Sequence, residues 1–151
     1  MTIRCANRDV AMHAKHMPLE FIQGYGNLCA FRGTGSRGHL PHRLANIYWD
    51  RHRTILMTIR SYATPIAWLD ECEETGELVW VEPSVNYSVT TGKHQGTLYQ
   101  LSYPEHDRSS HRQVSVPYDV SMDEYLRVLA GKMLFSHDQN KTVPGPNWSL
   151  D

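Results

Sequence analysis

The sequence predicts an α+β domain in which a small antiparallel β-sheet is covered by about three helices. Residues 54–89 read as apolar, strand-like segments separated by turns that are too short for parallel crossovers. Helical patterns flank them at 40–51, 90–101 and 121–135. With 151 residues, no internal repeat and no linker, the chain is expected to form a single domain, 1–151.

Residues 40–51 are predicted to form a helix, followed by a strand at 54–60. The helix has one apolar stripe at spacing i, i+4, i+7 and i+8, formed by Leu40, Leu44, Ile47 and Tyr48. Pro41 stands in its first turn, where a missing N–H is harmless. In the strand, simple alternation places three apolar side chains on one face, namely Ile55, Met57 and Ile59.

The segments 62–69 and 77–81 are predicted to pair as an antiparallel hairpin around the acidic turn 70–76. Both are apolar, and the connection of about seven residues is too short for a parallel crossover. Pro65 predicts an edge or a bulge, because proline cannot donate to the strand ladder. A third strand is predicted from alternation, with Val85, Tyr87 and Val89 pointing into the core.

The C-terminal helix, 121–135, is the best-marked element. Ser121 and Glu124 have the spacing of a capping box. An apolar stripe at helical spacing is formed by Met122, Leu126, Leu129 and Met133, so Leu129 is expected to be buried. The polar stretch 103–115 before the helix is predicted to be loop, and the tail from about residue 139 to 151 to be poorly ordered.

The loop Arg32–Gly38 contains three glycines with the spacing GxGxxG, formed by Gly33, Gly35 and Gly38. This spacing occurs in dinucleotide-binding turns, but there it follows a strand of a βαβ unit and precedes an acidic ribose ligand. Here Thr58 stands near the acidic position, and the chain reads as hairpins. A flexible loop is favoured, with a simple anion-binding nest assisted by Arg32 and Arg37 as an alternative.

The polar run Thr90–Gln95 is the second candidate site. Thr90 or Thr91 is expected to cap a helix, whose first N–H groups, together with Lys93, His94 and Gln95, offer donors to an anion. The competing interpretation is purely structural, with a threonine cap and exposed Lys93 and His94. A lysine in the first turn of a helix opposes the helix dipole, which favours an anion between them.

Two segments of the sequence resemble a known family. Tyr62–Trp68 (YATPIAW) and Tyr87–Gln95 (YSVTTGKHQ) are similar to the SYxTPIAW and YSVTTSKHQ segments of a small domain of unknown function found in bacteriophage proteins, including mycobacteriophage ones. The resemblance covers about residues 58–100, with Gly92 where those proteins commonly have serine. It implies a phage-encoded protein of the infected cell's cytoplasm and implies no chemistry.

Composition limits the function further. The formal net charge of −1 argues against a general nucleic-acid binder, although the acid is concentrated in Asp70–Glu82 and leaves room for a local basic patch. The pairs His13/His16 and His39/His42 lack a third ligand nearby, so no metal and no cofactor are expected. No secretory signal or apolar run long enough to cross a membrane is present.

Two hypotheses about function follow. The leading one is a non-enzymatic, cytoplasmic phage accessory protein that binds a host macromolecule, with a host protein as the suspected partner. The alternative is a nucleic-acid or phosphate-ligand binding protein that uses Arg32, Arg37, Lys93 and His94. No nucleophile motif such as GxSxG occurs, and Cys72 lies among carboxylates that disfavour a thiolate, so an enzyme ranks third.

Overall fold

A seven-stranded mixed sheet forms the centre of the molecule. The computed structural model describes residues 1–102, 110–136 and 142–150. The strands lie in chain order across the sheet: β1 (Thr2–Cys5), β2 (Phe21–Gly24), β3 (Leu28–Arg32), β4 (Ile55–Ser61), β5 (Thr64–Glu71), β6 (Leu78–Ser84) and β7 (Arg112–Pro117). Neighbours from β2 to β6 pair antiparallel, whereas both outer pairs, β1–β2 and β6–β7, are parallel.

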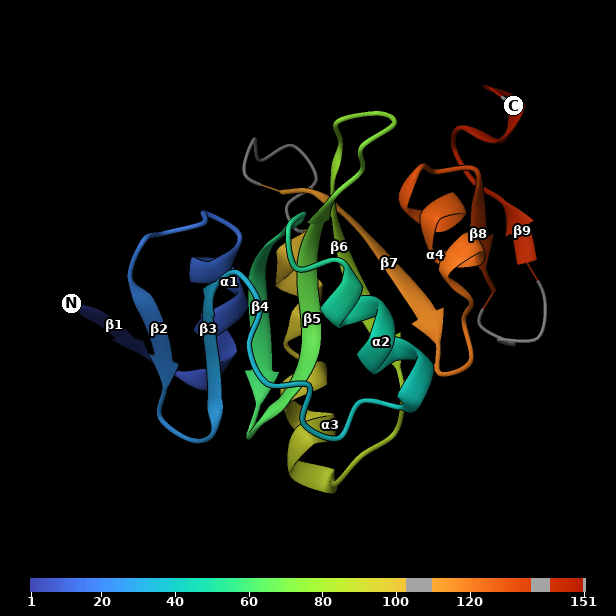
Figure 1. The fold of residues 1–151 in the computed structure, drawn as a ribbon. Coiled ribbons are helices and arrows are strands. Elements are labelled where there is room, and N and C mark those ends of the chain that lie inside the picture. The colour runs from blue at the N-terminus through green and yellow to red at the C-terminus, as the bar shows by residue number, and fades with distance from the viewer. Residues whose placement is uncertain (103–109, 137–141, 151) are drawn as a thin grey trace.

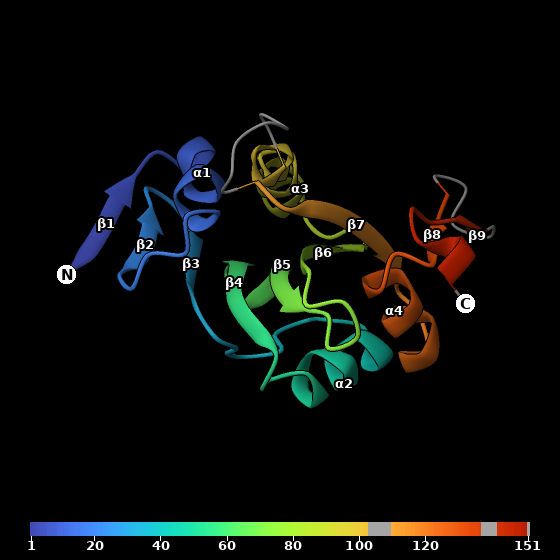
Figure 2. The ribbon, with the colours of Figure 1, turned by 90° about the horizontal axis from the view of Figure 1, so that it is seen from above.

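Helices cover both faces of this sheet, which gives three layers (Figures 1 and 2). On one face lie α1 (Val10–Ala14), α3 (Val89–Gln95) and the short 3-10 helix η2 (Leu98–Leu101); on the other lie α2 (His42–Asp50) and α4 (Met122–Leu129). The remaining elements are two 3-10 helices, η1 (Asn7–Asp9) and η3 (Trp148–Leu150), and a separate hairpin of β8 (Met133–Phe135) and β9 (Thr142–Pro144).

The predicted fold class, a small antiparallel sheet under about three helices, is wrong. The sheet extends far beyond residues 54–89, because β1, β2, β3 and β7 add to it, and its two outer pairs are parallel. The predicted strand through Val85, Tyr87 and Val89 is absent: residues 85–88 are irregular and a helix begins at Val89, whose side chain is 80% exposed. Short strands such as β1 give little periodicity to detect.

The central hairpin is confirmed. β5 and β6 pair antiparallel around the acidic turn, with Trp68 opposite Val81. The irregularity expected at Pro65 is present, since the β4–β5 register shifts between Ile59 and Arg60, and Arg60 lies opposite Pro65. A second shift, between Ile55 and Met57, turns Ile55 to the opposite face from Met57 and Ile59, so the prediction that these three share one face is wrong.

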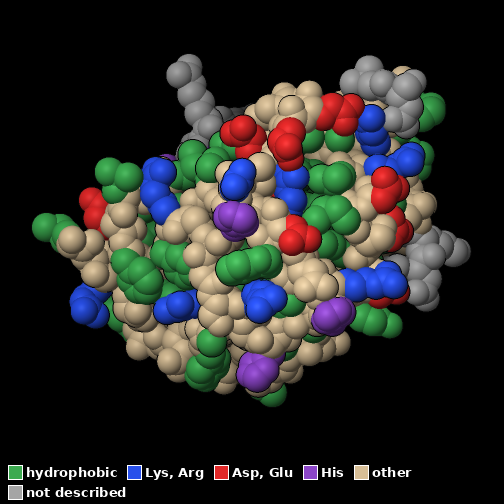
Figure 3. Space-filling model, in the orientation of Figure 1, with side chains coloured by type: hydrophobic (Ala, Val, Ile, Leu, Met, Phe, Trp, Pro, Cys, Tyr) green, Lys and Arg blue, Asp and Glu red, His purple; other side chains and the backbone are tan. Residues whose placement is uncertain are grey.

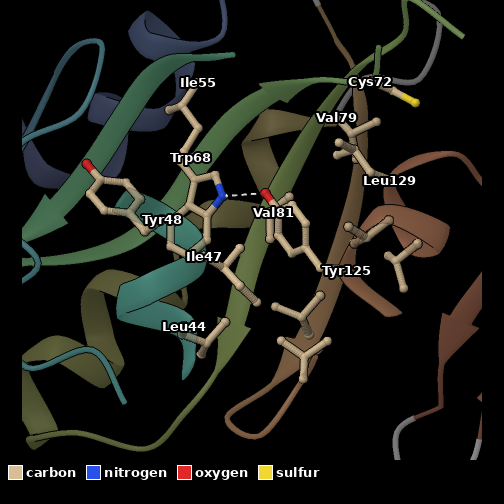
Figure 4. Close-up of a cluster of buried hydrophobic side chains, with 14 of the residues drawn as sticks. Leu44, Ile47, Tyr48, Ile55, Trp68, Cys72, Val79, Val81, Tyr125 and Leu129 are labelled. Atoms are coloured by element: carbon tan, nitrogen blue, oxygen red, sulfur yellow. Dashed lines mark hydrogen bonds between the residues drawn. The ribbon is translucent and has the colours of Figure 1, made fainter. Parts of the chain in front are cut away.

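The predicted helix at 40–51 is confirmed as α2, and its stripe packs into the larger core cluster with Trp68, Val79 and Val81 from the sheet and Tyr125 and Leu129 from α4 (Figure 4). The Trp68 indole Nε1 donates to the Tyr125 hydroxyl at 2.8 Å, so even the polar atoms of this core are paired. Because α2 buries only one side, its other side is free to face solvent.

A buried charge network anchors the same layer. Arg51, at the C-cap of α2, donates from Nε and Nη2 to the two carboxylate oxygens of Asp70 at 2.9 and 3.1 Å. Tyr125 donates to Asp70 Oδ2 at 2.7 Å, and Arg51 also pairs with the exposed Glu73. Asp70 is fully buried, so this bidentate pair links α2, β5 and α4 in a medium that strengthens it.

The C-terminal helix begins as predicted and ends earlier. Ser121 and Glu124 form the expected capping box, and Leu129 is buried. The helix stops at Leu129, because Gly131 adopts a left-handed conformation (φ +76°), and Met133 belongs to β8. Leu126 is 40% exposed, so the stripe runs through Tyr125, Val128 and Leu129 instead.

Two further expectations fall partly outside the described residues. Of the stretch 103–115, which was expected to be loop, residues 112–115 belong to β7 and 103–109 are not described. Of the tail 139–151, residues 142–150 form β9 and η3. Within the described ranges, no helix is long and apolar enough to cross a membrane.

Candidate functional site

Two segments that are far apart in the sequence, the end of β4 and helix α3, meet in the structure. Ser61, at the end of β4, contacts His94 of α3 through a hydrogen bond of 2.7 Å between Ser61 Oγ and His94 Nδ1. Thr91 Oγ1 lies 3.0 Å from the same Ser61 hydroxyl. All three side chains are buried. The cluster therefore fixes α3 against the tip of the β4–β5 hairpin and leaves His94 and Thr91 unavailable as surface ligands.

The capping residue of α3 is Ser88, and the prediction of Thr90 or Thr91 is wrong. The backbone N–H of Thr91 donates to Ser88 Oγ at 3.2 Å. Gln95 is also in a structural position, since its Nε2 donates to the Val85 carbonyl at 3.0 Å. Thr90 and Lys93 are exposed. A Cβ added at Gly92 would meet nothing within 4 Å, so this position lies outside the cluster.

The three glycine N–H groups of the loop are already used within the protein, so they are not available to an anion nest. Gly33 N–H donates to the Leu56 carbonyl, Gly35 N–H to the Tyr48 hydroxyl and Gly38 N–H to Ser36 Oγ, at 2.9, 2.9 and 3.1 Å. The loop also joins β3 to α2 and then to the antiparallel β4, so it does not belong to a βαβ unit. The dinucleotide interpretation therefore lacks its structural context, and a nest in this loop could not use the glycine N–H groups.

The same loop is pinned to the hairpin tip. His39 N–H donates to Thr64 Oγ1 at 2.8 Å. Gly38 has φ +51°, and a Cβ there would lie 2.4 Å from the Ala63 carbonyl oxygen, so only glycine permits this approach. The Ser61–Thr64 tip thus has α3 on one side and the loop that carries Arg37 on the other.

The two predicted arginines have different environments. Arg32 donates from its guanidinium to the carbonyl oxygens of Met17 and Pro18, which makes it a structural clamp for the end of α1. The Arg37 guanidinium lies 5.5 Å from the centroid of the Trp49 ring, on the solvent side of α2. Since α2 and α3 cover opposite faces of the sheet (Figure 2), Arg37 and Lys93 do not form one site.

A cationic surface surrounds Arg37 on the α2 side of the sheet. We call it the α2 surface and define it by Arg37, His39, His42, Arg43, Trp49, His52, Arg53 and Arg60. Residues 32–63 hold six arginines and three histidines against one acidic residue, Asp50. Figure 3 shows basic and histidine side chains spread over this face, with acidic side chains mainly near the β5–β6 turn and around α4. The overall charge of −1 therefore conceals a marked separation of charge.

Aromatic rings lie among these cations. Besides the Arg37–Trp49 pair, the Arg60 guanidinium lies 5.2 Å from the Phe31 ring centroid. Phe31 pairs with Thr58, whose hydroxyl contacts Tyr48 of α2, so this second pair is on the same face. Trp49 is 57% exposed although the apolar stripe of its helix is buried.

Trp49, Arg60 and Tyr62 did not stand out in the sequence. A signal was present: Trp49 falls outside the Leu40–Tyr48 stripe, and residues 32–63 are strongly basic. Among the described residues, no three His, Cys, Asp or Glu side chains converge into a metal-binding group.

The fold and surface define a small three-layer domain with a curved mixed sheet and one cationic, aromatic-bearing face (Figures 2 and 3). The chain belongs to a family of unknown function, DUF8033, whose model matches residues 15–114. That range contains β2 to β6, α2, α3 and the α2 surface. Comparisons with curated proteins and with solved structures found no match.

Proposed function

We propose that this protein is a nucleic-acid-binding protein that contacts phosphates through the α2 surface. The observation that carries the proposal is the separation of charge along the chain. Residues 32–63 contain six arginines and only one acidic residue. Arg51 is neutralised by Asp70 and Arg32 is bound to carbonyls, but Arg37, Arg53 and Arg60 have no carboxylate partner among the described residues. Unpaired arginines on one face are what sequence-independent phosphate binding requires.

The proposal takes up the alternative expected from the sequence, a nucleic-acid or phosphate-ligand binding protein, and changes its residues. It is compatible with the leading expectation, a non-enzymatic accessory protein that binds a host macromolecule, and the resemblance to bacteriophage proteins supports the cytoplasm of an infected bacterium as its setting. Nucleic acid is favoured over a host protein because Arg37 and Arg53 are exposed on this face without a carboxylate partner among the described residues, and guanidinium groups suit phosphate. Of the residues first considered, Arg37 stays, and Lys93 is a separate exposed cation on α3.

The test is salt-dependent binding of fluorescently labelled 20-mers, single-stranded and duplex, measured by anisotropy. Wild-type protein is expected to bind at low salt and to weaken steeply as salt rises. The double variant Arg37→Gln/Arg53→Gln should reduce the slope of log K against log salt by about 2, since each lost phosphate contact removes about one unit. Arg8→Gln is the matched control, because Arg8 is an exposed arginine before α1, on the other face of the sheet.

Absence of binding to either oligonucleotide at low salt would overturn the proposal. Equal weakening by Arg8→Gln and by the α2-surface variant would also contradict it, because it would show diffuse attraction without a site. In that case the suspected host protein becomes the leading partner, and recovery of a host protein from lysate after nuclease treatment would be the corresponding result.

A further inference from the structure

We infer that the nucleic acid is single-stranded and that its bases stack on Trp49 and Tyr62, on either side of the glycine-rich loop. This inference rests on the proposed function and specifies its ligand. A duplex hides the faces of its bases in its own stack, whereas a single strand offers them to aromatic rings. An exposed ring beside Arg37 and a second exposed ring at the hairpin tip are therefore features that a duplex would leave unused.

Trp49 is the first stacking position. Its ring is 57% exposed and has Arg37 over it at 5.5 Å and the His52 ring at 5.9 Å. Within the described part of the chain, the side chain of Arg37 has no hydrogen bond or ion pair, so the Trp49 ring alone holds it. A base that takes the place of the guanidinium on the ring releases Arg37 to the adjacent phosphate, so both contacts form together.

Tyr62 is the second position, and its backbone supplies independent support. Tyr62 has φ +55°, in the left-handed region where a bulky residue is strained. It occupies the first position of the two-residue turn between β4 and β5, where glycine is usual. The ring is nevertheless 51% exposed, with the His94 ring 6.5 Å away. Strained residues that persist on a surface often serve a ligand.

The loop connects the two rings. Gly38, next to Arg37, lies against Ala63, next to Tyr62, so Arg37 and Tyr62 belong to neighbouring surface segments. His39 lies between them and is exposed. In the opposite direction the surface becomes acidic: the hollow of about 360 Å³ beside Arg43 is lined by Asp119 and Glu124. Repulsion there directs the strand from Trp49 toward the hairpin tip.

The experiment compares Trp49→Leu and Tyr62→Gly with wild type, using a single-stranded 12-mer and its duplex. Each substitution is expected to weaken single-strand binding about tenfold, the usual effect of losing one base–aromatic stack. Duplex binding should stay unchanged, because a duplex does not use the rings and neither substitution removes a cationic side chain. Tyr62→Gly should leave the melting temperature equal or higher, since glycine relieves the left-handed strain, so weaker binding cannot be ascribed to unfolding.

Trp148→Phe is the matched control, because Trp148 is 60% exposed but lies in η3. In the Trp148→Phe variant, single-stranded DNA should quench the fluorescence of Trp49, the remaining exposed tryptophan. The buried Trp68 and Trp80 are shielded from the DNA. If the protein binds in a salt-dependent way and neither Trp49→Leu nor Tyr62→Gly changes the affinity, this inference is wrong and the proposed function still stands. No binding at low salt would remove both.

Discussion

At the scale of single residues, His94 shows how a polar motif can be structural. Its ring accepts or donates a 2.7 Å hydrogen bond with Ser61, which also contacts Thr91, and all three are buried under α3. The sequence singled out Thr91 and His94 as candidate anion ligands, whereas in the structure they join two distant segments. It could not show that they point inward, because neither residue type has a fixed preference for burial.

Burial of His94 predicts a pH-dependent stability. Burial lowers the pKa of His94 below its ordinary 6.5. Near pH 6.5 the unfolded chain therefore binds a proton at His94 that the folded chain does not bind. The contribution of His94 to the free energy of unfolding is fully present above pH 6.5 and decreases as the pH falls below it. Urea unfolding at pH 7.5, 6.0 and 5.0 should show this decrease in wild type and a smaller one in His94→Gln.

His111 and Glu82 also have shifted pKa values, and both residues are present in wild type and in His94→Gln. Burial also lowers the pKa of His111, with the same sign as His94. Burial raises the pKa of Glu82 above 4.5, which favours the folded state at lower pH and so opposes the histidines. The difference between wild type and His94→Gln removes both contributions. Identical pH profiles for the two proteins would show that His94 does not titrate as its burial requires.

At the scale of elements, α4 tests how burial translates into stability. Leu129 is buried in the cluster that contains Trp68 and Tyr125, so Leu129→Ala should lower the free energy of unfolding by about 2–5 kcal/mol. Leu126→Ala removes the same atoms from a position that is 40% exposed and should cost less than about 1 kcal/mol. Chemical denaturation of both variants measures the contrast, and equal losses would contradict the assignment of the buried face.

Elements that depend on residues close together in the sequence could be predicted. Elements that form only through contacts with distant parts of the chain could not. The α2 stripe, the hairpin of β5 and β6 and the Ser121–Glu124 box all depend on neighbouring residues. By contrast, β7 is polar on one side and becomes a strand only because β6 offers it an edge. Alternation at Val85–Val89 suggested a strand, but Ser88 caps a helix there instead. Capping overrode the weaker periodic signal.

At the scale of the whole molecule, the Arg51–Asp70 pair holds one helical layer to the sheet. Asp70 is fully buried and accepts from both Arg51 and Tyr125. Asp70→Ala should lower the free energy of unfolding by about 3–5 kcal/mol, because it leaves the Arg51 charge buried without its partner. Glu73→Gln is the control: Glu73 is 70% exposed, and its loss should cost about 1 kcal/mol or less.

Urea denaturation decides between these expectations, and the double variant Arg51→Met/Asp70→Leu adds a further check. If the charge left without a partner causes the loss, the double variant should recover much of it, because apolar residues of similar size replace a buried pair with little cost. A double variant as unstable as Asp70→Ala would show that packing around α2 matters more than charge.

The α2 surface is also a property of the whole molecule. Its basic composition was visible in the sequence, but Arg37, Trp49 and Tyr62 come together only because Gly38 lets the loop lie on the hairpin tip. The glycine pattern favours a flexible loop, with an anion nest as the alternative, whereas in the structure Gly38 brings the backbones of the loop and the hairpin tip into contact. Pattern alone does not distinguish these roles, since both need a residue without a side chain.

The parallel edges of the sheet have a consequence for folding. β4, β5 and β6 are joined by the short segments 62–63 and 72–77, whereas β1–β2, β3–β4 and β6–β7 are joined by the longer segments 6–20, 33–54 and 85–111. Contacts between nearby residues form faster than contacts that close long loops, so the sheet is expected to assemble from the β4–β6 meander outward and to open from its edges first. Tyr62 belongs to that meander, whereas Arg37 and Trp49 lie in the segment 33–54, so the α2 surface is expected to be complete only after β3 has joined β4.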